Sequence, residues 1–277
     1  MIIDNIDPIV HHPLMYSIGP IPLSGFGLAV MSGFVIGGIV AARELTRRGY
    51  DAAPVEPIVF AAVIGFVIGA KLYYAVLMQD ASVLLSTWGY VFWGGFGGGV
   101  ASGMLMARRK GMPIMRISDV AAPGIAAGYA VGRTGCWAVG DDYGRPWDSP
   151  LAVAFPEGIP PSTVANLQKF GIDAPPGALP TDVIAVHPTQ LYETALGFVM
   201  FIILWRLRAH RHAEGWLFGV YLVLAGVERF AIEFLRAKDD RFFGGLTVAQ
   251  VIAFGMVVAG VVWAWARWGP AAKPSGV

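Results

Sequence analysis

Long apolar stretches alternate with short polar connections along most of the chain. An α-helix needs about 20 mostly apolar residues to cross the hydrocarbon core of a bilayer, and several stretches reach or approach that length. They lie at residues 24–42, 56–78, 88–107, 117–139, 189–205, 216–235 and 247–265. The pattern therefore predicts an all-α integral membrane protein with about seven transmembrane helices.

Residues 141–188 interrupt this pattern between the predicted fourth and fifth helices. The stretch is polar and rich in proline, and an irregular backbone in lipid would leave its N–H and C=O groups without hydrogen-bond partners. We expect it to lie outside the membrane. Because it is short for an independent hydrophobic core, we interpret the whole chain, residues 1–277, as a single membrane domain.

The composition also indicates a membrane protein, since 56% of the residues are hydrophobic and 14% are charged. About a quarter of the residues are charged in an ordinary soluble domain. The net charge of +1 gives no indication of a nucleic-acid partner. Cys136 is the single cysteine, so no intrachain disulfide can form. Residues 1–16 lack the basic cluster of a cleaved signal peptide, and we expect the helices themselves to direct insertion.

Lysine and arginine are distributed unevenly between the two ends of the predicted helices. The first, third and fifth connections and the C-terminal tail carry 12 of these residues, and the opposite side carries 5. Basic residues stay on the cytoplasmic side, so we expect the N-terminus outside and the C-terminus inside. In a bacterium the chain would then be a multi-pass protein of the cytoplasmic (inner) membrane, with residues 141–188 in the periplasm.

Three basic residues fall inside the predicted spans: Lys71, Arg133 and Arg229. A charge at the bilayer centre costs about 2.5–3.5 kcal/mol on insertion scales, so such residues usually face the interior of a bundle. Glu233 lies four residues after Arg229, on the same helix face, where the two can form an ion pair. Arg133 lies near the outer end of its helix and can bind a phosphate through two parallel hydrogen bonds. The alternative for both arginines is an ion pair with a purely structural role. The alternative for Lys71 is a long side chain whose ammonium group reaches the membrane–water interface.

Two polar motifs are predicted to meet at the outer surface. The fifth helix opens with the heptapeptide HPTQLYE at residues 187–193. A proline near a helix start is expected, but a helix start alone does not account for the other polar side chains. These are His187, Gln190, Tyr192 and Glu193. The second motif, residues 132–146, concentrates charge and glycine at the end of the fourth helix, so the two motifs can form opposite walls of one site.

Residues 94–99 contain a dense cluster of glycine in the predicted third helix. Tight helix packing is the simpler explanation. The cluster is denser than packing requires, because each glycine lowers helix propensity by about 1 kcal/mol. The alternative is a kink or a contact between lipid and backbone. The five histidines have no spacing with carboxylates that suits a metal ion. We therefore predict neither a metal nor another cofactor.

Three motifs make the sequence resemble the prolipoprotein diacylglyceryl transferase family over nearly its whole length. They are residues 132–146 continued by LAVAFP at 151–156, the HPTQLYE heptapeptide, and RFAIEFLR at 229–236 followed by Leu246, Thr247 and Gln250. The resemblance implies seven helices and an outer N-terminus. It also implies the reaction, in which the diacylglyceryl group of phosphatidylglycerol is transferred to the thiol of a lipobox cysteine and glycerol phosphate is released. The implied partners are phosphatidylglycerol, the signal-peptide and lipobox region of prolipoproteins, and membrane lipids.

The resemblance also implies roles for individual residues. Arg133 and Arg229 would stabilise the leaving phosphate, because fixed cations aimed at developing negative charge are strong catalytic groups. Glu233 would hold Arg229, and His187 would accept the proton of the incoming thiol. Asp141 stands where the family has a glutamate. The predicted substrate-binding residues are Arg133, Gly97, Gly98, Gln190, Tyr192, Glu193 and Arg236.

The sequence departs from the family at positions near this site. Phe26 replaces a tyrosine of the family. The glycine-rich third span lacks the histidine of the family, and we expect Gly97 to occupy the position of that histidine. Cys136 replaces an asparagine, and the sequence Val-Gly-Asp at 139–141 replaces Asn-Gly-Glu. Cys136 could be a nucleophile, although a small apolar filling is the simpler interpretation. The alternatives are a diverged member that uses another acceptor, and a lipid-binding or transport protein without this activity.

Overall fold

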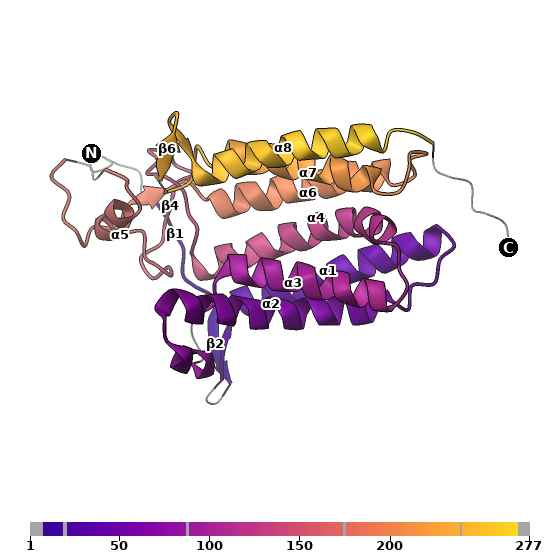
Figure 1. The fold of residues 1–277 in the computed structure, drawn as a ribbon. Helices are drawn as coiled ribbons and strands as arrows, with labels where there is room; N and C mark the ends of the chain where they lie inside the picture. Colours follow the sequence, from indigo (N-terminus) through magenta and orange to yellow (C-terminus); the bar gives the residue numbers. More distant parts are fainter. Residues whose placement is uncertain (1–7, 19–20, 87–88, 174–175, 239, 271–277) are drawn as a thin grey trace.

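The computed structural model describes residues 8–18, 21–86, 89–173, 176–238 and 240–270. Seven long helices run side by side through these residues (Figure 1). They are α1 Gly25–Arg47, α2 Val55–Met78, α3 Phe92–Arg109, α4 Ile114–Val139, α6 Thr189–Leu207, α7 Trp216–Ile232 and α8 Val248–Ala266. Each overlaps one predicted apolar stretch, so the mainly helical architecture is confirmed.

Four of the described helices, α1, α2, α6 and α8, are long and apolar enough to cross a membrane. This agrees with the prediction of an integral membrane protein. α3 is rich in glycine and ends in arginines, α4 carries three charged side chains, and α7 has 17 residues. Length and composition therefore do not mark these three helices as spans by themselves.

Two helix ends differ most from the prediction, and the others agree to within three residues. α1 continues to Arg47, beyond the predicted end at residue 42, because the buried Glu44 pairs with Arg47 and Arg48 and neutralises the last turn. α3 begins at Phe92, whereas the predicted start at residue 88 lies outside the described residues. Gly89 has a φ angle of 85°, a left-handed conformation that a helix cannot include and that glycine adopts without strain.

The helices pack in pairs, and glycine residues form the closest contacts. α1 packs on α4, α2 on α3 and α7 on α8, while α6 contacts both α4 and α7. A Cβ atom added to Gly98 would lie 2.2 Å from the carbonyl oxygen of Gly65, and one added to Gly33 would lie 2.7 Å from that of Gly128. Small residues allow helix backbones to approach this closely. In Figure 1, α6, α7 and α8 form one group above α1 and α4.

Short elements gather at one end of the helices (Figure 1). β4 Val153–Ala154 pairs in parallel with β1 Ile9–Val10 and antiparallel with β5 Ala185–Val186. Helix α5 Val164–Lys169 follows β4. Its Leu167 belongs to the same buried core as Val153 of β4 and Val186 of β5. These strands are not predictable from the sequence, because two-residue strands leave no periodic pattern. Residues 141–188 thus contain a small core, and their assignment to a single membrane domain stays a prediction.

The remaining elements are hairpin β2 Met15–Ile18 with β3 Ile21–Ser24, the short helix η1 Ala81–Leu85, and hairpin β6 Arg241–Phe243 with β7 Leu246–Thr247. Lys71 of α2 attaches η1 to the helices. Its Nζ donates to the carbonyl oxygens of Val83 and Ser86 at 3.2 and 2.6 Å, and it lies 4.7 Å from the centre of the Tyr90 ring. These contacts favour a structural role for Lys71.

Candidate functional site

The end of α4 brings two acidic residues back toward Arg133. Gly140 has a φ angle of 68° and ends the helix in the left-handed conformation, which favours glycine. The backbone N–H of Asp141 still donates to the carbonyl oxygen of Cys136. Asp142 also has a positive φ of 55°, and the Nη1 atom of Arg133 donates to its Oδ2 at 2.9 Å. The turn after the helix therefore supplies a carboxylate partner for the predicted phosphate-binding arginine.

Glu193 of α6 lies among all three arginines of the predicted site. Its carboxylate pairs with Nη2 of Arg133. The nearest nitrogens of Arg236 and Arg229 lie 3.7 and 3.9 Å from its Oε1. The Glu193 side chain is only 2% exposed, and a buried carboxylate is tolerated when cations and hydrogen bonds compensate it. The HPTQLYE motif and the end of the fourth helix thus meet, as the sequence analysis predicted.

The end of α7 completes the arrangement. Arg229 pairs with Glu233 at 2.6 Å, which confirms the ion pair predicted from their spacing. The hydroxyl of Thr247 donates to the other oxygen of Glu233 at 3.1 Å. Arg236 donates to Oδ1 of Asp142 at 2.5 Å. We call the six charged residues the arginine cluster: Arg133, Arg229, Arg236, Asp142, Glu193 and Glu233.

The arginine cluster has equal numbers of positive and negative side chains, and its exposure is uneven. The side chain of Arg229 is 30% exposed, against 12% for Arg133 and 15% for Arg236. Among the described residues, the buried Nε atoms of Arg133 and Arg236 have no hydrogen-bond partner. Buried donors normally have an acceptor, and the oxygens of an anionic group such as phosphate are suitable acceptors. The cluster can therefore bind an anion.

The two acidic residues after α4 have different environments. Burial, followed by the charge of Asp142, raises the pKa of Asp141 to about 6. Although burial acts on Asp142 as well, Arg236 and Arg133 hold its pKa well below the usual range. The backbone oxygen of Asp141 accepts a hydrogen bond from Nε2 of Gln190 at 2.5 Å. Gln190 therefore fixes the turn that presents both carboxylates.

Cys136, Asp141 and Asp142 place possible metal-ligating atoms within 4.8 Å of one another. Arg133 argues against a metal ion here, because its Nη1 donates both to Sγ of Cys136 at 3.3 Å and to Asp142 at 2.9 Å. A positive guanidinium group would repel a cation at this position. The cysteine is buried, which agrees with its interpretation as a small filling residue.

His187 lies beside the cluster rather than in it. Its ring stacks on Trp147 with centroids 4.3 Å apart, and its Nδ1 is 3.4 Å from the hydroxyl oxygen of Tyr192. Burial lowers the pKa of His187. Its role as a proton acceptor stays a prediction, since the contacts found for the described residues connect it with Tyr192 and not with an arginine of the cluster.

Gly97 and Gly98 occupy different environments on α3. Gly98 packs against Gly65 and Gly69 of α2, and the closest approach is between backbones. No atom of the described residues lies within 4 Å of a Cβ added to Gly97. The position of Gly98 is explained by helix packing, and the substrate-binding role of both residues stays a prediction.

Three residues at this site, Asp142, Tyr129 and Glu228, were not assigned a site role from the sequence. Tyr129 of α4 donates to Oε1 of Glu228 at 3.0 Å, and its hydroxyl oxygen is 3.4 Å from Oε1 of Glu193. A signal was present, because Tyr129 precedes Arg133 by one helical turn and therefore lies on the same face. Glu228 directly precedes Arg229 in α7.

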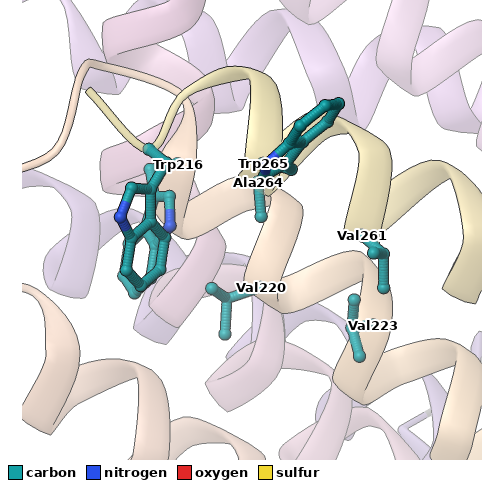
Figure 2. A pocket seen from close by; sticks show the side chains of 7 residues that line it. Trp216, Val220, Val223, Val261, Ala264 and Trp265 are labelled. Atoms are coloured by element: carbon teal, nitrogen blue, oxygen red, sulfur yellow. The ribbon is translucent and has the colours of Figure 1, made fainter.

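Two apolar grooves open on the helical surface. One, of about 360 Å³, lies beside the arginine cluster and is lined by Tyr192, Ala195, Leu196, Ala231, Ile232 and Leu235. The other, of about 340 Å³, lies between α7 and α8, where Trp216, Val220 and Trp265 line it (Figure 2). Trp216 begins α7 and Arg229 is near its end, about 20 Å away at the helical rise. Apolar side chains line the second groove almost entirely, so it can accept a lipid chain but does not carry the chemistry of the cluster.

Comparison with known proteins adds a family to this geometry. A family model described as prolipoprotein diacylglyceryl transferase matches residues 13–266. A Phosphatidylglycerol–prolipoprotein diacylglyceryl transferase of Proteus mirabilis strain HI4320 is 32% identical over 276 residues, covering 92% of each chain. Proteins of the same name from Vibrio vulnificus strain CMCP6 and Escherichia coli O1:K1 / APEC are 31% and 32% identical, covering 95% and 92% of this chain and 93% and 94% of theirs. The resemblance found in the motifs is confirmed, and the chain belongs to the prolipoprotein diacylglyceryl transferase family.

Proposed function

We propose that this protein transfers the diacylglyceryl group of phosphatidylglycerol to the sulfur of a lipobox cysteine in a prolipoprotein and releases glycerol phosphate. The observation that carries this proposal is the arginine cluster, which holds three guanidinium groups where α4 and α7 end. The relatives are named for phosphatidylglycerol and prolipoprotein, and a phosphate diester is an anion that such a cluster suits.

The reaction needs a stabilised leaving group and a thiol without its proton. Sulfur attacks the glycerol carbon, a C–S bond forms, and the C–O bond to phosphate breaks with its electron pair on the phosphate oxygen. Arg229 has the most exposed side chain of the three arginines. Among the described residues the Nε atoms of Arg133 and Arg236 make no hydrogen bond, although that of Arg236 lies 3.8 Å from Glu233. Preorganised donors and cations of this kind stabilise the charge that develops on the phosphate.

The proposed substrate-binding residues surround the cluster. Gln190 holds the turn after α4, Tyr192 lines the adjacent apolar groove, and Gly97 and Gly98 lie on α3. His187 is a candidate proton acceptor, because its lowered pKa keeps its ring neutral near pH 7. Asp141, in the turn after α4, is a further candidate catalytic residue. An acceptor is required because a cysteine thiol with a pKa of about 8.5 is mostly protonated at neutral pH.

We further propose seven membrane spans, with the N-terminus and residues 141–188 in the periplasm and the C-terminus in the cytoplasm. The short strands gather at one end of the helices (Figure 1), and the arginine cluster lies where α4 and α7 end. Most lysines and arginines of the connections fall at the other end, which is the cytoplasmic end by the positive-inside rule. The site would then face the outer leaflet of the inner membrane, where a secreted precursor is accessible.

The test is incubation of the purified protein with phosphatidylglycerol radiolabelled in its acyl chains and a peptide that contains a lipobox cysteine. We expect label on the peptide, and Arg133→Ala should lower the rate by about 100- to 1000-fold, as for the loss of one preorganised donor. Arg43→Ala is the matched control, because this arginine is exposed on the predicted cytoplasmic side and should leave the rate unchanged.

A second candidate, a family member with another acceptor, is favoured by one observation. Cys136 and Phe26 stand at positions where the family has polar side chains, and the third span has no histidine. If the labelled peptide is absent but glycerol phosphate or a new lipid is released, the donor is right and the acceptor is wrong. If the labelled lipid stays unchanged with every acceptor, the transferase proposal is wrong and a lipid-binding role remains.

A further inference from the structure

Two buried glutamates and a partly buried tyrosine, from three helices, lie in contact beside the arginine cluster. Tyr129 of α4 donates to Glu228 of α7 at 3.0 Å, and the same hydroxyl lies 3.4 Å from Glu193 of α6. Glu193 is 2% exposed and Glu228 is 9% exposed. A hydroxyl group has one proton to donate and two lone pairs with which to accept. Tyr129 can therefore donate to one carboxylate while it accepts a proton from the other.

The two carboxylates on either side of Tyr129 have different partners. Glu193 pairs with Arg133 and lies within ion-pair distance of Arg229 and Arg236. Glu228 has no guanidinium nitrogen within ion-pair distance among the described residues, and Tyr129 is the partner found for it. Cations favour the ionised form of a carboxyl group, and burial without a cation favours the protonated form. A proton on Glu193 is therefore more stable after it moves to Glu228.

We propose that Glu228, and not the candidates His187 or Asp141, receives the thiol proton of the transfer reaction, through Glu193 and Tyr129. The inference rests on the proposed function, because it concerns a proton that only a thiol acceptor supplies. Glu228 acts through two other side chains, so it is a positioning residue for the proton rather than a group that touches the substrate.

The steps balance without another reactant. The sulfur of the acceptor bonds to the glycerol carbon, and the C–O bond to phosphate breaks with its electrons on the phosphate oxygen. The proton of the thiol passes to the carboxylate of Glu193. Glu193 then donates to the oxygen of Tyr129, which passes its own proton to Glu228. Each later turnover requires Glu228 to release that proton, to the departing phosphate or to water.

The charged and titratable groups around Glu228 favour it, among Glu193, Tyr129 and Glu228, as the residue that holds the transferred proton. Tyr129 and Arg133 face it from α4, and Glu193 faces it from α6. On α7 itself its charged and titratable neighbours are Tyr221 and Arg229. α8, which packs on α7, has no charged residue between Val248 and Ala266. Arg133 and Arg229 are both engaged by other carboxylates.

The first test compares the pH dependence of peptide labelling for Glu228→Gln and Tyr129→Phe with that of the unchanged protein. We expect each variant to lose about 100-fold in rate near neutral pH, the lower range for general base catalysis. The loss should shrink toward about twofold at about pH 9, because a thiol with a pKa of about 8.5 is then ionised in solution. The double variant should match the single ones, since both interrupt one pathway. Glu56→Gln, at an exposed glutamate of α2, is the matched control and should follow the unchanged protein.

A structural role would lower the rate by the same factor at every pH, and that result would overturn the inference. It would also be overturned if Asp141→Asn, and not Glu228→Gln, produced the loss that recovers at high pH. Asp141 is the appropriate rival because it, too, has no arginine among the ion pairs found for the described residues.

A second measurement does not depend on activity. Infrared difference spectra of the purified protein, recorded while the pH is lowered, detect the carbonyl band of each carboxyl group that becomes protonated. We expect a buried-acid band that is absent in Glu228→Gln and still present in Glu193→Gln. A band that disappears only in Glu193→Gln would contradict the proposed order of protonation. If the protein shows this band but labels no peptide, Glu228 binds the proton as proposed, and the assignment of a lipobox cysteine as the acceptor is wrong.

Discussion

Arg133 is the residue at which the contacts of the site converge. Its guanidinium group donates to Asp142, Glu193 and Cys136 at once. A planar guanidinium can hold several acceptors in fixed directions, whereas a lysine ammonium group is a compact point charge. The carboxylates therefore orient Arg133 before any substrate arrives.

The neighbouring residues Asp141 and Asp142 should affect stability in opposite directions as the pH changes. The folded pKa of Asp141, about 6, lies above its ordinary value of 3.8. The folded state therefore binds the Asp141 proton more tightly than the unfolded state, and this contribution is lost as the pH rises through about 6. The pKa of Asp142 is lowered from its ordinary value of 3.8, so its ionised carboxylate stabilises the folded state at pH values above 3.8. This stabilisation is lost as the pH falls below that value.

Replacing Asp141 by asparagine should therefore stabilise the protein at pH 7 by up to about 3 kcal/mol, since each pKa unit corresponds to about 1.4 kcal/mol. The gain should disappear toward about pH 4, where Asp141 of the unchanged protein becomes protonated. Thermal unfolding in detergent at several pH values measures this. Asp142→Asn is the matched control and should lower the midpoint at pH 7. A loss of stability in Asp141→Asn at both pH values would show that its carboxylate has a favourable partner.

At the scale of helices, the α2–α3 pair depends on glycine contacts between backbones. Gly94 and Gly98 of α3 face Gly69 and Gly65 of α2, and an added Cβ on any of them would approach a carbonyl oxygen to 2.4 Å or less. Ser102 of α3 also donates to the carbonyl oxygen of Ala61 at 2.8 Å. The interface leaves no room for a side chain at these four glycines, so their spacing is accounted for by packing.

Gly98→Ala should therefore separate the two helices and lower the free energy of unfolding by about 1–3 kcal/mol, the usual cost of overpacking. Gly97→Ala is the matched control on the same helix, because a Cβ there meets no described atom within 4 Å. It should be neutral or stabilising by up to about 1 kcal/mol through helix propensity. Thermal midpoints of the two variants in detergent provide the comparison, and equal destabilisation would contradict the packing explanation.

The elements show which features a sequence can predict. The apolar stretches predicted every long helix, and the four-residue spacing of Arg229 and Glu233 predicted their ion pair, because both signals are local. The pairing of Arg133 with Glu193 joins residues 60 positions apart, and that of Tyr129 with Glu228 joins residues 99 apart. Such contacts depend on how helices pack. The motifs indicated that the two walls would meet, but the partner of each side chain required the structure.

At the scale of the whole molecule, charged contacts connect the two groups of helices at both ends. The arginine cluster joins the end of α4 to α6 and α7. At the opposite end, Asp119 of α4 is fully buried and pairs with Arg48, which follows α1, at 3.2 Å. Asp119 also accepts from the backbone N–H of Leu217 at 2.8 Å and lies 2.9 Å from Nε2 of His210. A carboxylate at the N-terminus of α7 complements the helix dipole.

Asp119→Asn should therefore lower the free energy of unfolding by about 3 kcal/mol, because the largely buried Arg48, 15% exposed, would lose one of its two carboxylate partners. The control Glu214→Gln removes the partner of Arg116, a pair at the same end with side chains 23% and 33% exposed, and should cost less than about 1 kcal/mol. Thermal unfolding in detergent distinguishes the two, and equal losses would show that Asp119 does not join the helix groups. Because Asp119→Asn leaves the arginine cluster intact, peptide labelling per folded molecule should stay unchanged below the unfolding temperature. A parallel loss of labelling would instead mean that the contacts of Asp119 align α4 with α6 and α7, and so bring Arg133 to Glu193.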